Sequence, residues 1–447
     1  MLKFVFGVVL IGLGFACALL LEPVWGLYLF SALTHIRLEQ LGESYTLPLR
    51  VPIVIGVLTL LLYLFSSKYP QKLRRWPAEV WLFALMILGM ALSSAHAIFA
   101  PDLAWAMTFD YIKYWVFMVL LIQMLDTRKR LDGFYWTMVL SAAWLVFRAW
   151  DLRGTTGERF ENIGGGSISD SNHYAAALVL LFPFVYHRTL SSDRRIAIGA
   201  AVLCFGVVMA MIIANSRGAF LGTITLAVLI LLCIKKGRTR NVVALVLLGV
   251  LGVFFAKQSQ LDRLMSVVGA ASGEARDNSA ALRLVFWGLA WDLFKDHPLL
   301  GVGPANFPYY SGTMLEGLPY GQAGHVTHSL WFEMLSQGGL LVTVPFVIML
   351  LRFFYTSQRL ARHYMAAGQE EIAMYIYVPM FGLAGLMVAS SFLDRMTYEP
   401  IFWCIGLGAV HRYLWAAEAK VVGVGAARSN TAPRAAMPPG SPMRKRV

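Results

Sequence analysis

Charged residues are scarce in this chain of 447 residues. Asp, Glu, Lys and Arg together make up 14% of the sequence, whereas soluble globular domains carry about 25%. Apolar residues reach 58% and the mean hydropathy is +0.62, which excludes an ordinary water-soluble enzyme. Apolar runs separated by short charged clusters are instead typical of a polytopic membrane protein, because a bilayer core about 30 Å thick needs roughly 20 apolar helical residues per crossing.

Acidic residues and cysteines are also few. The 25 Asp and Glu are outnumbered by 38 Lys and Arg, which gives a net charge of +13. These cations fall in short segments between apolar runs, so they indicate membrane-flanking loops and no nucleic-acid partner. Each of the four cysteines lies inside a separate apolar run, which indicates neither a disulfide framework nor a zinc site.

Twelve apolar runs are long enough to be membrane spans, and the first is interpreted as a retained span and not as a cleaved signal peptide. The expected spans are residues 3–21, 49–65, 78–99, 111–125, 131–150, 172–187, 196–214, 217–234, 241–256, 330–355, 372–393 and 400–416. Residues 23–34 are also apolar and predict either an interfacial helix or a thirteenth crossing. The predicted fold class is therefore an all-α polytopic integral membrane protein with about twelve transmembrane helices.

Basic clusters recur in alternate loops, for example at Arg128–Arg130 and Lys235–Lys236, and predict that the N-terminus is cytoplasmic. With this orientation one extracytoplasmic connection is far longer than the others, and long loops are usually functional. The predicted regions are an N-terminal transmembrane bundle (1–256), a large periplasmic loop (257–329), C-terminal transmembrane helices (330–416) and a disordered basic cytoplasmic tail (417–447).

The large loop contains one clear helical pattern. In residues 279–296, Leu282, Phe286, Leu289 and Leu293 recur at helical spacing. This spacing predicts an amphipathic helix that lies with its apolar side against the membrane.

Two histidines lie where the loop re-enters the membrane. His325 and His328 are three residues apart, so a helical conformation would place both imidazoles on one side, facing the outer aqueous layer. A histidine there can exchange a proton near neutral pH. The ordinary alternative is an interfacial histidine bonded to lipid headgroups. A metal pair is a third reading, although no cluster of Cys or carboxylates supplies the remaining ligands.

Two arginines occupy positions that favour anions. Ser216 can cap a helix, which places Arg217 in its first turn, where free N–H groups and the helix dipole already attract negative charge. Arg283 lies on the predicted loop helix one turn before Trp287 and can form a fork with a phosphate. The alternatives are a snorkelling arginine that binds lipid phosphate at Arg217 and an unspecialised interfacial helix at Arg283.

The outer loop 151–171 contributes further polar groups at the membrane edge. Arg159, Asp170 and Asn172 flank the run Gly164–Gly166, which allows the backbone to fold closely over a ligand. The glycines are equally compatible with a plain hinge, and Asp170 with a helix cap. Between the last two expected spans, Asp394 and Arg395 predict a local ion pair.

These groups converge on one predicted face. Several cations near headgroup depth suit a diphosphate embedded in lipid, and a histidine beside them suits the deprotonation of a hydroxyl. A secondary transporter or flippase is the alternative from another class. It should place ionisable residues at mid-bilayer, whereas most spans here are apolar in their middles.

Three segments resemble the O-antigen ligase and polymerase superfamily of bacterial envelope-glycan assembly. They are SRGAFLG around Arg217, ALRLVFWGLAWDLFKDHPLLGVGPANF around Arg283, and HSLWFEMLSQGG from His328, with Gly339 at the position that the family's histidine motif requires. The likeness covers about residues 170–355. Val342 stands where that motif usually ends in Gly, Thr or Tyr.

The resemblance implies a C-type glycosyltransferase-like fold and a metal-independent, inverting enzyme without a cofactor. The donor would be a glycan on undecaprenyl pyrophosphate, and the acceptor lipid A-core, joined on the periplasmic face of the bacterial inner membrane by a monomer surrounded by membrane lipids. From the chemistry of these residues we expect His328 to act as general base, Arg217 and Arg283 to hold the diphosphate, and the remaining candidates to contact substrate, namely His325, Arg159, Asp170 and Asn172. An O-antigen polymerase or a protein O-oligosaccharide ligase would use the same donor.

Overall fold

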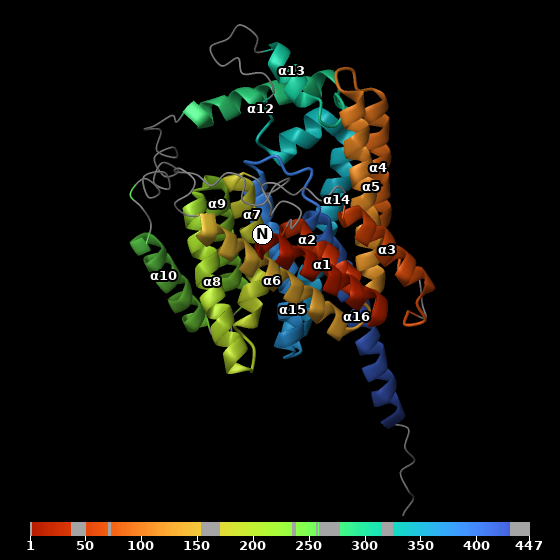
Figure 1. Cartoon of the computed structure of the whole chain (residues 1–447), viewed down its shortest axis with the longest axis vertical. Helices are drawn as coiled ribbons and strands as arrows, with labels where there is room; N and C mark the ends of the chain where they lie inside the picture. Colours follow the sequence, from red (N-terminus) through yellow and green to blue (C-terminus); the bar gives the residue numbers. More distant parts are fainter. Residues whose placement is uncertain are drawn as a thin grey trace, which may run out of the picture.

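The computed structural model describes residues 2–36, 51–69, 73–152, 170–234, 238–255, 258, 278–314 and 325–429. Within these residues every regular element is a helix, which confirms the all-α prediction (Figure 1). The helices are α1 (Leu2–Leu20), α2 (Val24–Ile36), α3 (Val51–Phe65), α4 (Ala78–Ala95), α5 (Pro101–Met124), α6 (Arg128–Leu152), α7 (Ser171–Arg188), α8 (Arg194–Ala214), α9 (Arg217–Cys233), α10 (Arg238–Phe255), α12 (Asn278–Asp296), α13 (Phe307–Met314), α14 (Leu330–Ala366), α15 (Glu370–Ser390) and α16 (Pro400–Ser429).

Five helices in the described part of the chain are long and apolar enough to cross a membrane, namely α4, α5, α8, α14 and α15. Five further apolar stretches are shorter, and one of them is α2, which covers the ambiguous segment 23–34. The number of twelve crossings therefore stays a prediction, as does the periplasmic position of the large loop.

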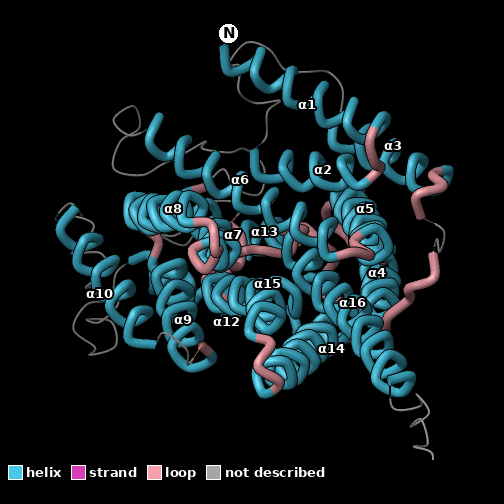
Figure 2. Tube along the Cα trace, turned by 90° about the horizontal axis from the view of Figure 1, so that it is seen from below, coloured by secondary structure: helices cyan, strands magenta, loops and turns pink. Residues whose placement is uncertain are grey.

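The helices form a bundle around α15, most of whose residues are buried, and α15 packs against α7, α9, α14 and α16 (Figure 2). At one end, which we term the loop end, α12 and α13 lie across the bundle (Figure 1). At the opposite, or tail, end α16 projects away from the other helices (Figure 1). Both views place α10 at the rim, outside α8 and α9. The chain ascends and descends between these two ends.

A break in α14 attaches the loop to the bundle. Gly339 has φ 60° and ψ −162°, a conformation that is essentially restricted to glycine. The helix hydrogen bonds lost there are replaced across to the turn that follows α12. The N–H groups of Leu340 and Leu341 donate to the carbonyls of Pro298 and Leu299, at 2.9 and 3.1 Å.

The turn that follows α12 also donates two hydrogen bonds to α14. The N–H groups of Val302 and Gly303 donate to the carbonyls of Ser336 and Gln337, at 2.9 and 3.0 Å. The two segments thus satisfy each other's backbone groups, as buried peptide groups must.

The loop helix is where it was predicted, but its surroundings differ from the prediction. In α12, Phe286, Ala290 and Leu293 pack against Val302 and Phe307 of the loop itself. The apolar side that was expected to lie against the membrane is therefore buried in a small core of the loop. The prediction was wrong in this respect because the partner of the apolar face lies nearby in the same loop.

The last helix extends beyond the boundary expected from the sequence. α16 continues to Ser429, whereas a disordered tail was predicted from residue 417. The division of the chain into membrane and loop regions otherwise stays a prediction.

Candidate functional site

His328 lies at the loop end, just before α14. Its backbone has φ 51°, in the left-handed region that non-glycine residues seldom adopt. Neighbouring groups hold this turn, because the Trp287 indole of α12 donates to the Thr327 carbonyl at 3.0 Å and the Thr327 hydroxyl donates to the Ser329 carbonyl at 3.0 Å. A strained conformation that is fixed in this way is typical of a functional residue.

The Asp394 carboxylate faces the His328 imidazole. Nδ1 of His328 lies 3.7 Å from Oδ2 of Asp394, and the two side chains are 36% and 16% exposed. This distance is longer than a hydrogen bond but within the range of an ion pair when the imidazole is protonated. Because Nδ1 faces the carboxylate, Nε2 is the nitrogen that remains for a substrate.

Asp394 is held in place by α7. Nε2 of His173 donates to the Asp394 carbonyl at 2.8 Å, and Nδ1 of His173 lies 3.5 Å from Oδ1 of Asp170. Asp170 thus contributes to the position of Asp394 indirectly, through its contact with His173.

Glu333 fixes the other side of the same turn. Its carboxylate is buried in α14 and accepts the N–H groups of Arg395 and Met396 at 3.0 and 3.2 Å. The Arg395 side chain is 1% exposed, donates to the His173 carbonyl, and lies 4.0 Å above the Tyr398 ring. Burial lowers the pKa of Arg395 to about 10, so its guanidinium is still charged at neutral pH.

The electrostatic environment keeps His328 neutral at physiological pH. Burial is the main cause that lowers its pKa from the ordinary 6.5, and the charges of Arg283 and His325 lower it further, while Asp394 and Asp170 raise it. The Phe286 ring lies between the two histidines, with its centroid 5.1 Å from His325 and 6.4 Å from His328. A neutral imidazole with one nitrogen oriented by a carboxylate is suited to accept a proton.

Arg217 is the first residue of α9 and lies at the same end of the bundle. The Ser216 hydroxyl accepts the Ala219 N–H at 3.4 Å, which confirms the predicted cap. The next residue, Gly218, packs so closely on α15 that an added Cβ would lie 3.1 Å from the Ala389 carbonyl oxygen and 3.5 Å from Phe392.

The Phe392 ring in turn lies 6.2 Å from that of Trp287, one turn beyond Arg283 on α12. The N-terminus of α9, the end of α15 and the loop helix therefore meet around one point.

A cavity of about 280 Å³ lies beside the start of α9, and Ser216, which precedes Arg217, lines it. It is lined at its polar end by Asn215 and Ser216 and continues between α8, α9 and α10 past Phe220, Ile224 and Gly249. Thr223 is another polar residue on its wall, and its hydroxyl donates to the Ala219 carbonyl at 2.8 Å. The cavity is thus polar at the loop end and apolar beyond.

Six of the seven predicted site residues lie in the described part of the chain, and all six are at the loop end. Arg217, Arg283, His325 and His328 have the positions given above. Asp170 is the cap of α7 and accepts the N–H groups of Asn172 and His173 at 2.6 and 3.3 Å. Burial raises its pKa, but the bonds and charge of His173 outweigh this and hold the pKa below the usual range. Arg159 lies outside the described residues.

Sequence reasoning missed the groups that support His328. Asp394 and Arg395 were expected to pair locally, yet the carboxylate faces His328 and the guanidinium reaches His173. Glu333 was overlooked, although a carboxylate five residues after His328 at the start of an apolar run is itself a signal. In the described ranges no three His, Cys, Asp or Glu side chains come together as a candidate metal site.

Part of the chain is similar to a known protein family. No curated protein matches the chain. Residues 199–347 match the family described as O-Antigen ligase, and this range contains Arg217, Arg283, His325 and His328. In this range, about a third of its length, the chain is therefore similar to the O-antigen ligase family.

Proposed function

We propose that this protein is an O-antigen ligase that transfers a glycan from undecaprenyl pyrophosphate to lipid A-core on the periplasmic face of the inner membrane. The observation that carries the proposal is the pairing of His328 with Asp394, beside Arg283. His328 and Arg283 lie in the segment that matches the family, and Asp394 follows it. A base oriented by a carboxylate and flanked by a cation fits the attack of a hydroxyl on a sugar diphosphate.

The reaction has one proton transfer and one displacement. Nε2 of His328 takes the proton of the acceptor hydroxyl as that oxygen attacks the anomeric carbon from the face opposite the diphosphate. The bond between the anomeric carbon and the diphosphate oxygen breaks, so the configuration inverts and the electron pair leaves with undecaprenyl pyrophosphate. The proton on His328 then returns to solvent or to the departing diphosphate.

Asp394 acts as a positioning residue. Its carboxylate favours the tautomer of His328 that carries the proton on Nδ1, which leaves Nε2 as acceptor. It also stabilises the imidazolium formed during the reaction, and the 3.7 Å separation can shorten when that charge appears.

Arg217 and Arg283 would hold the diphosphate. Arg217 adds a guanidinium to the N-terminus of α9, where the helix dipole and free N–H groups already favour an anion. Arg283 is close enough to His328 to lower its pKa, so a diphosphate bound there lies near the base. His325, Asp170, Asn172 and Arg159 are proposed to contact the glycan portions of the substrates.

The cavity between α8, α9 and α10 would take the first units of the polyprenyl chain. Its polar end adjoins Arg217 and its apolar length runs away from the loop end. Ile224 lines it and is also 44% exposed on the outer surface, so a chain can enter sideways from the bilayer.

A transfer assay with purified protein tests this function. Vesicles containing lipid-linked glycan and lipid A-core should yield glycosylated lipid A-core, His328→Ala should abolish the product, and EDTA should not. His363→Ala, an exposed histidine at the tail end of α14, is the matched control and should be fully active. Longer lipid-linked glycans in place of glycosylated lipid A-core would identify a polymerase. Glycan movement without a covalent product would identify a flippase, and an active His328→Ala variant would refute the base.

A further inference from the structure

The turn that carries Asp394 is also held by α5, which reaches the loop end beside α4 (Figure 1). Tyr111 of this helix is 1% exposed, and its hydroxyl donates to the carbonyl of Met396 at 2.5 Å. Met396 follows Asp394 closely in the chain and is itself buried. The hydroxyl therefore acts on the turn close to the carboxylate that faces His328.

Two helices share the backbone of Met396. The Glu333 carboxylate of α14 accepts its N–H at 3.2 Å, and the Tyr111 hydroxyl of α5 binds its carbonyl. α5 also provides Tyr114, whose hydroxyl donates to the carbonyl of the next residue, Thr397, at 3.2 Å. Because buried backbone groups must be paired, these contacts fix the path of the turn.

The Tyr111 ring lies in apolar surroundings, where a phenylalanine would fill the same space. Its centroid lies 6.1 Å from that of Phe83 and 5.7 Å from that of Phe402, edge to face in both cases. Burying a hydroxyl costs free energy unless it forms a hydrogen bond. The hydroxyl of Tyr111 therefore serves the bond to the turn and not the packing of the ring. The ordinary alternative is a core tyrosine that contributes only to stability.

The Asp394 carboxylate depends on the backbone for its position. Among the described residues no hydrogen bond reaches its buried Oδ1. Its Oδ2 faces Nδ1 of His328 at 3.7 Å, which is beyond hydrogen-bond distance. His173 holds the Asp394 carbonyl and not the carboxylate. A shift of the turn would therefore move the carboxylate relative to the imidazole.

We propose that Tyr111 is a positioning residue for glycan transfer. Its hydroxyl holds the Met396 carbonyl and so keeps the Asp394 carboxylate directed at His328. The inference rests on the proposed function, because it gives Tyr111 a part in the step that His328 performs. The action of Tyr111 on the reaction is indirect and runs through Asp394.

The groups around His328 determine what the loss of this hydroxyl should do. Burial, Arg283 and His325 lower the pKa of the imidazole, whereas Asp394 and Asp170 raise it. If Asp394 moves away, one of the two groups that raise the pKa is weakened, and the pKa of His328 falls. The acidic limb of the pH profile, which reports protonation of the base, then moves to lower pH.

Kinetics of Tyr111→Phe in the vesicle transfer assay test the proposal. The value of kcat should fall about three- to tenfold, as expected for one lost hydrogen bond, while KM for either lipid substrate stays as in the wild type. The acidic limb should move to lower pH. A wild-type kcat, or a lowered kcat with an unmoved limb, would overturn the proposal.

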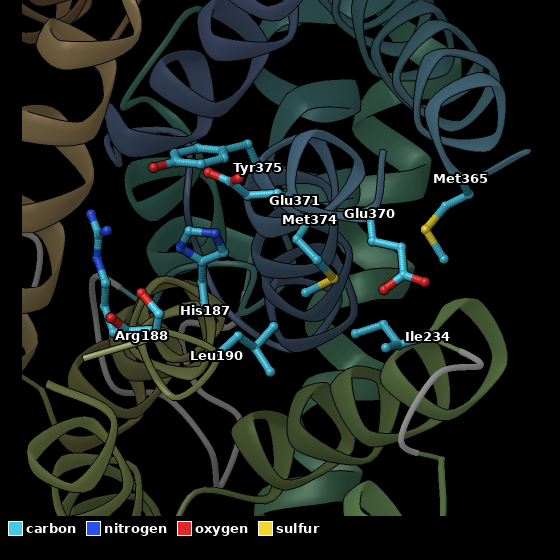
Figure 3. A pocket seen from close by; sticks show the side chains of 11 residues that line it. His187, Arg188, Leu190, Ile234, Met365, Glu370, Glu371, Met374 and Tyr375 are labelled. Atoms are coloured by element: carbon cyan, nitrogen blue, oxygen red, sulfur yellow. The ribbon is translucent and has the colours of Figure 1, made fainter. Parts of the chain in front are cut away.

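Tyr375→Phe is the matched control at the tail end. The Tyr375 hydroxyl donates to Oδ1 of Asp132 at 2.6 Å, and Figure 3 shows the Tyr375 ring in the wall of a cavity there. Each variant removes one hydrogen bond of a tyrosine hydroxyl, so both should lower the temperature of thermal unfolding. Only Tyr111→Phe should change kcat and the acidic limb, whereas a purely structural role predicts the same kinetics for the two variants.

A double variant shows whether Tyr111 acts through Asp394. Tyr111→Phe combined with Asp394→Asn should be no slower than Asp394→Asn alone, because the hydroxyl then has no carboxylate to position. Additive losses in the double variant would contradict the indirect role.

A measurement without turnover separates this inference from the proposed function. In NMR spectra of protein with isotope-labelled histidine, the signal that is lost in His328→Ala identifies His328. The pKa of that signal should be lower in Tyr111→Phe than in the wild type, and an unchanged pKa would overturn the inference. Wild-type protein that forms no glycosylated lipid A-core would instead contradict the proposed function, and the titration of His328 would still test the position of Asp394.

Discussion

Replacing Gly339 by alanine should detach the loop from α14. A Cβ on Gly339 would lie 2.4 Å from the Leu299 carbonyl oxygen and 2.7 Å from the Gly301 nitrogen, and both are backbone atoms that cannot turn aside. The backbone conformation itself costs about 1–3 kcal/mol in a residue other than glycine. The two hydrogen bonds donated by Leu340 and Leu341 add roughly 0.5–1.5 kcal/mol each when they are lost. The expected destabilisation is therefore about 2–6 kcal/mol.

Two measurements check this expectation. Thermal unfolding of the purified protein should show lower stability, and glycan transfer should fall, because the displaced turn follows the helix that carries Arg283. Gly288→Ala is the matched control, since Gly288 has open space around its missing Cβ and lies within α12. It should be neutral or slightly stabilising. Wild-type stability in Gly339→Ala would refute the close packing on which the argument depends.

The remaining predictions concern the site and the cavity beside it. Asp394→Asn should slow transfer and should also move the acidic limb of the pH profile to lower pH. The Asp394 carboxylate raises the pKa of His328, so removing that charge lowers this pKa. An acidic limb at the wild-type pH would refute the pairing. Arg217→Lys should reduce the rate about tenfold or more, since it keeps the charge but loses the fork, and undiminished transfer would show that the fork is unnecessary. Gly249→Leu fills open space in the cavity between α8, α9 and α10 and should raise KM about tenfold for the polyprenyl donor while sparing a short-chain donor. Gly199→Leu, in open space outside that cavity, is its control, and equal effects of the two would exclude the chain from this cavity.

Local patterns predicted most of the helices, although they did not predict α13 and they placed the start of α5 ten residues too late. Apolar runs end at charged clusters, and Ser216 and Asp170 cap the helices that follow them, so the starts of α9 and α7 were predicted to within a residue. Because successive spans run in opposite directions, the sequence also predicted that Arg217, Arg283 and His328 lie at the same end of the bundle. The helix starts depend on neighbouring residues, and the end at which a residue lies depends on the number of helices that precede it.

Contacts between distant segments could not be predicted in the same way. Asp394 faces His328 because α14 and the turn after α15 meet at the loop end, and no spacing in the sequence encodes that meeting. The apolar face of α12 illustrates the same limit, since its spacing indicates burial but does not say whether lipid or Val302 covers it. The need for glycine at position 339 arises only from the Leu299 carbonyl that lies against it.

The position of the turn that carries Asp394 and Arg395 limits which segments can be exchanged between this chain and proteins of the O-antigen ligase family. The matched range, 199–347, includes His328 but neither that turn nor His173. A chimaera built from this range alone would transfer His328, the proposed base, without the carboxylate that faces it. Its junctions would instead need to enclose Asp170 at one side and Tyr398 at the other, so that His328 is transferred together with the groups that hold Asp394 and Arg395 in place.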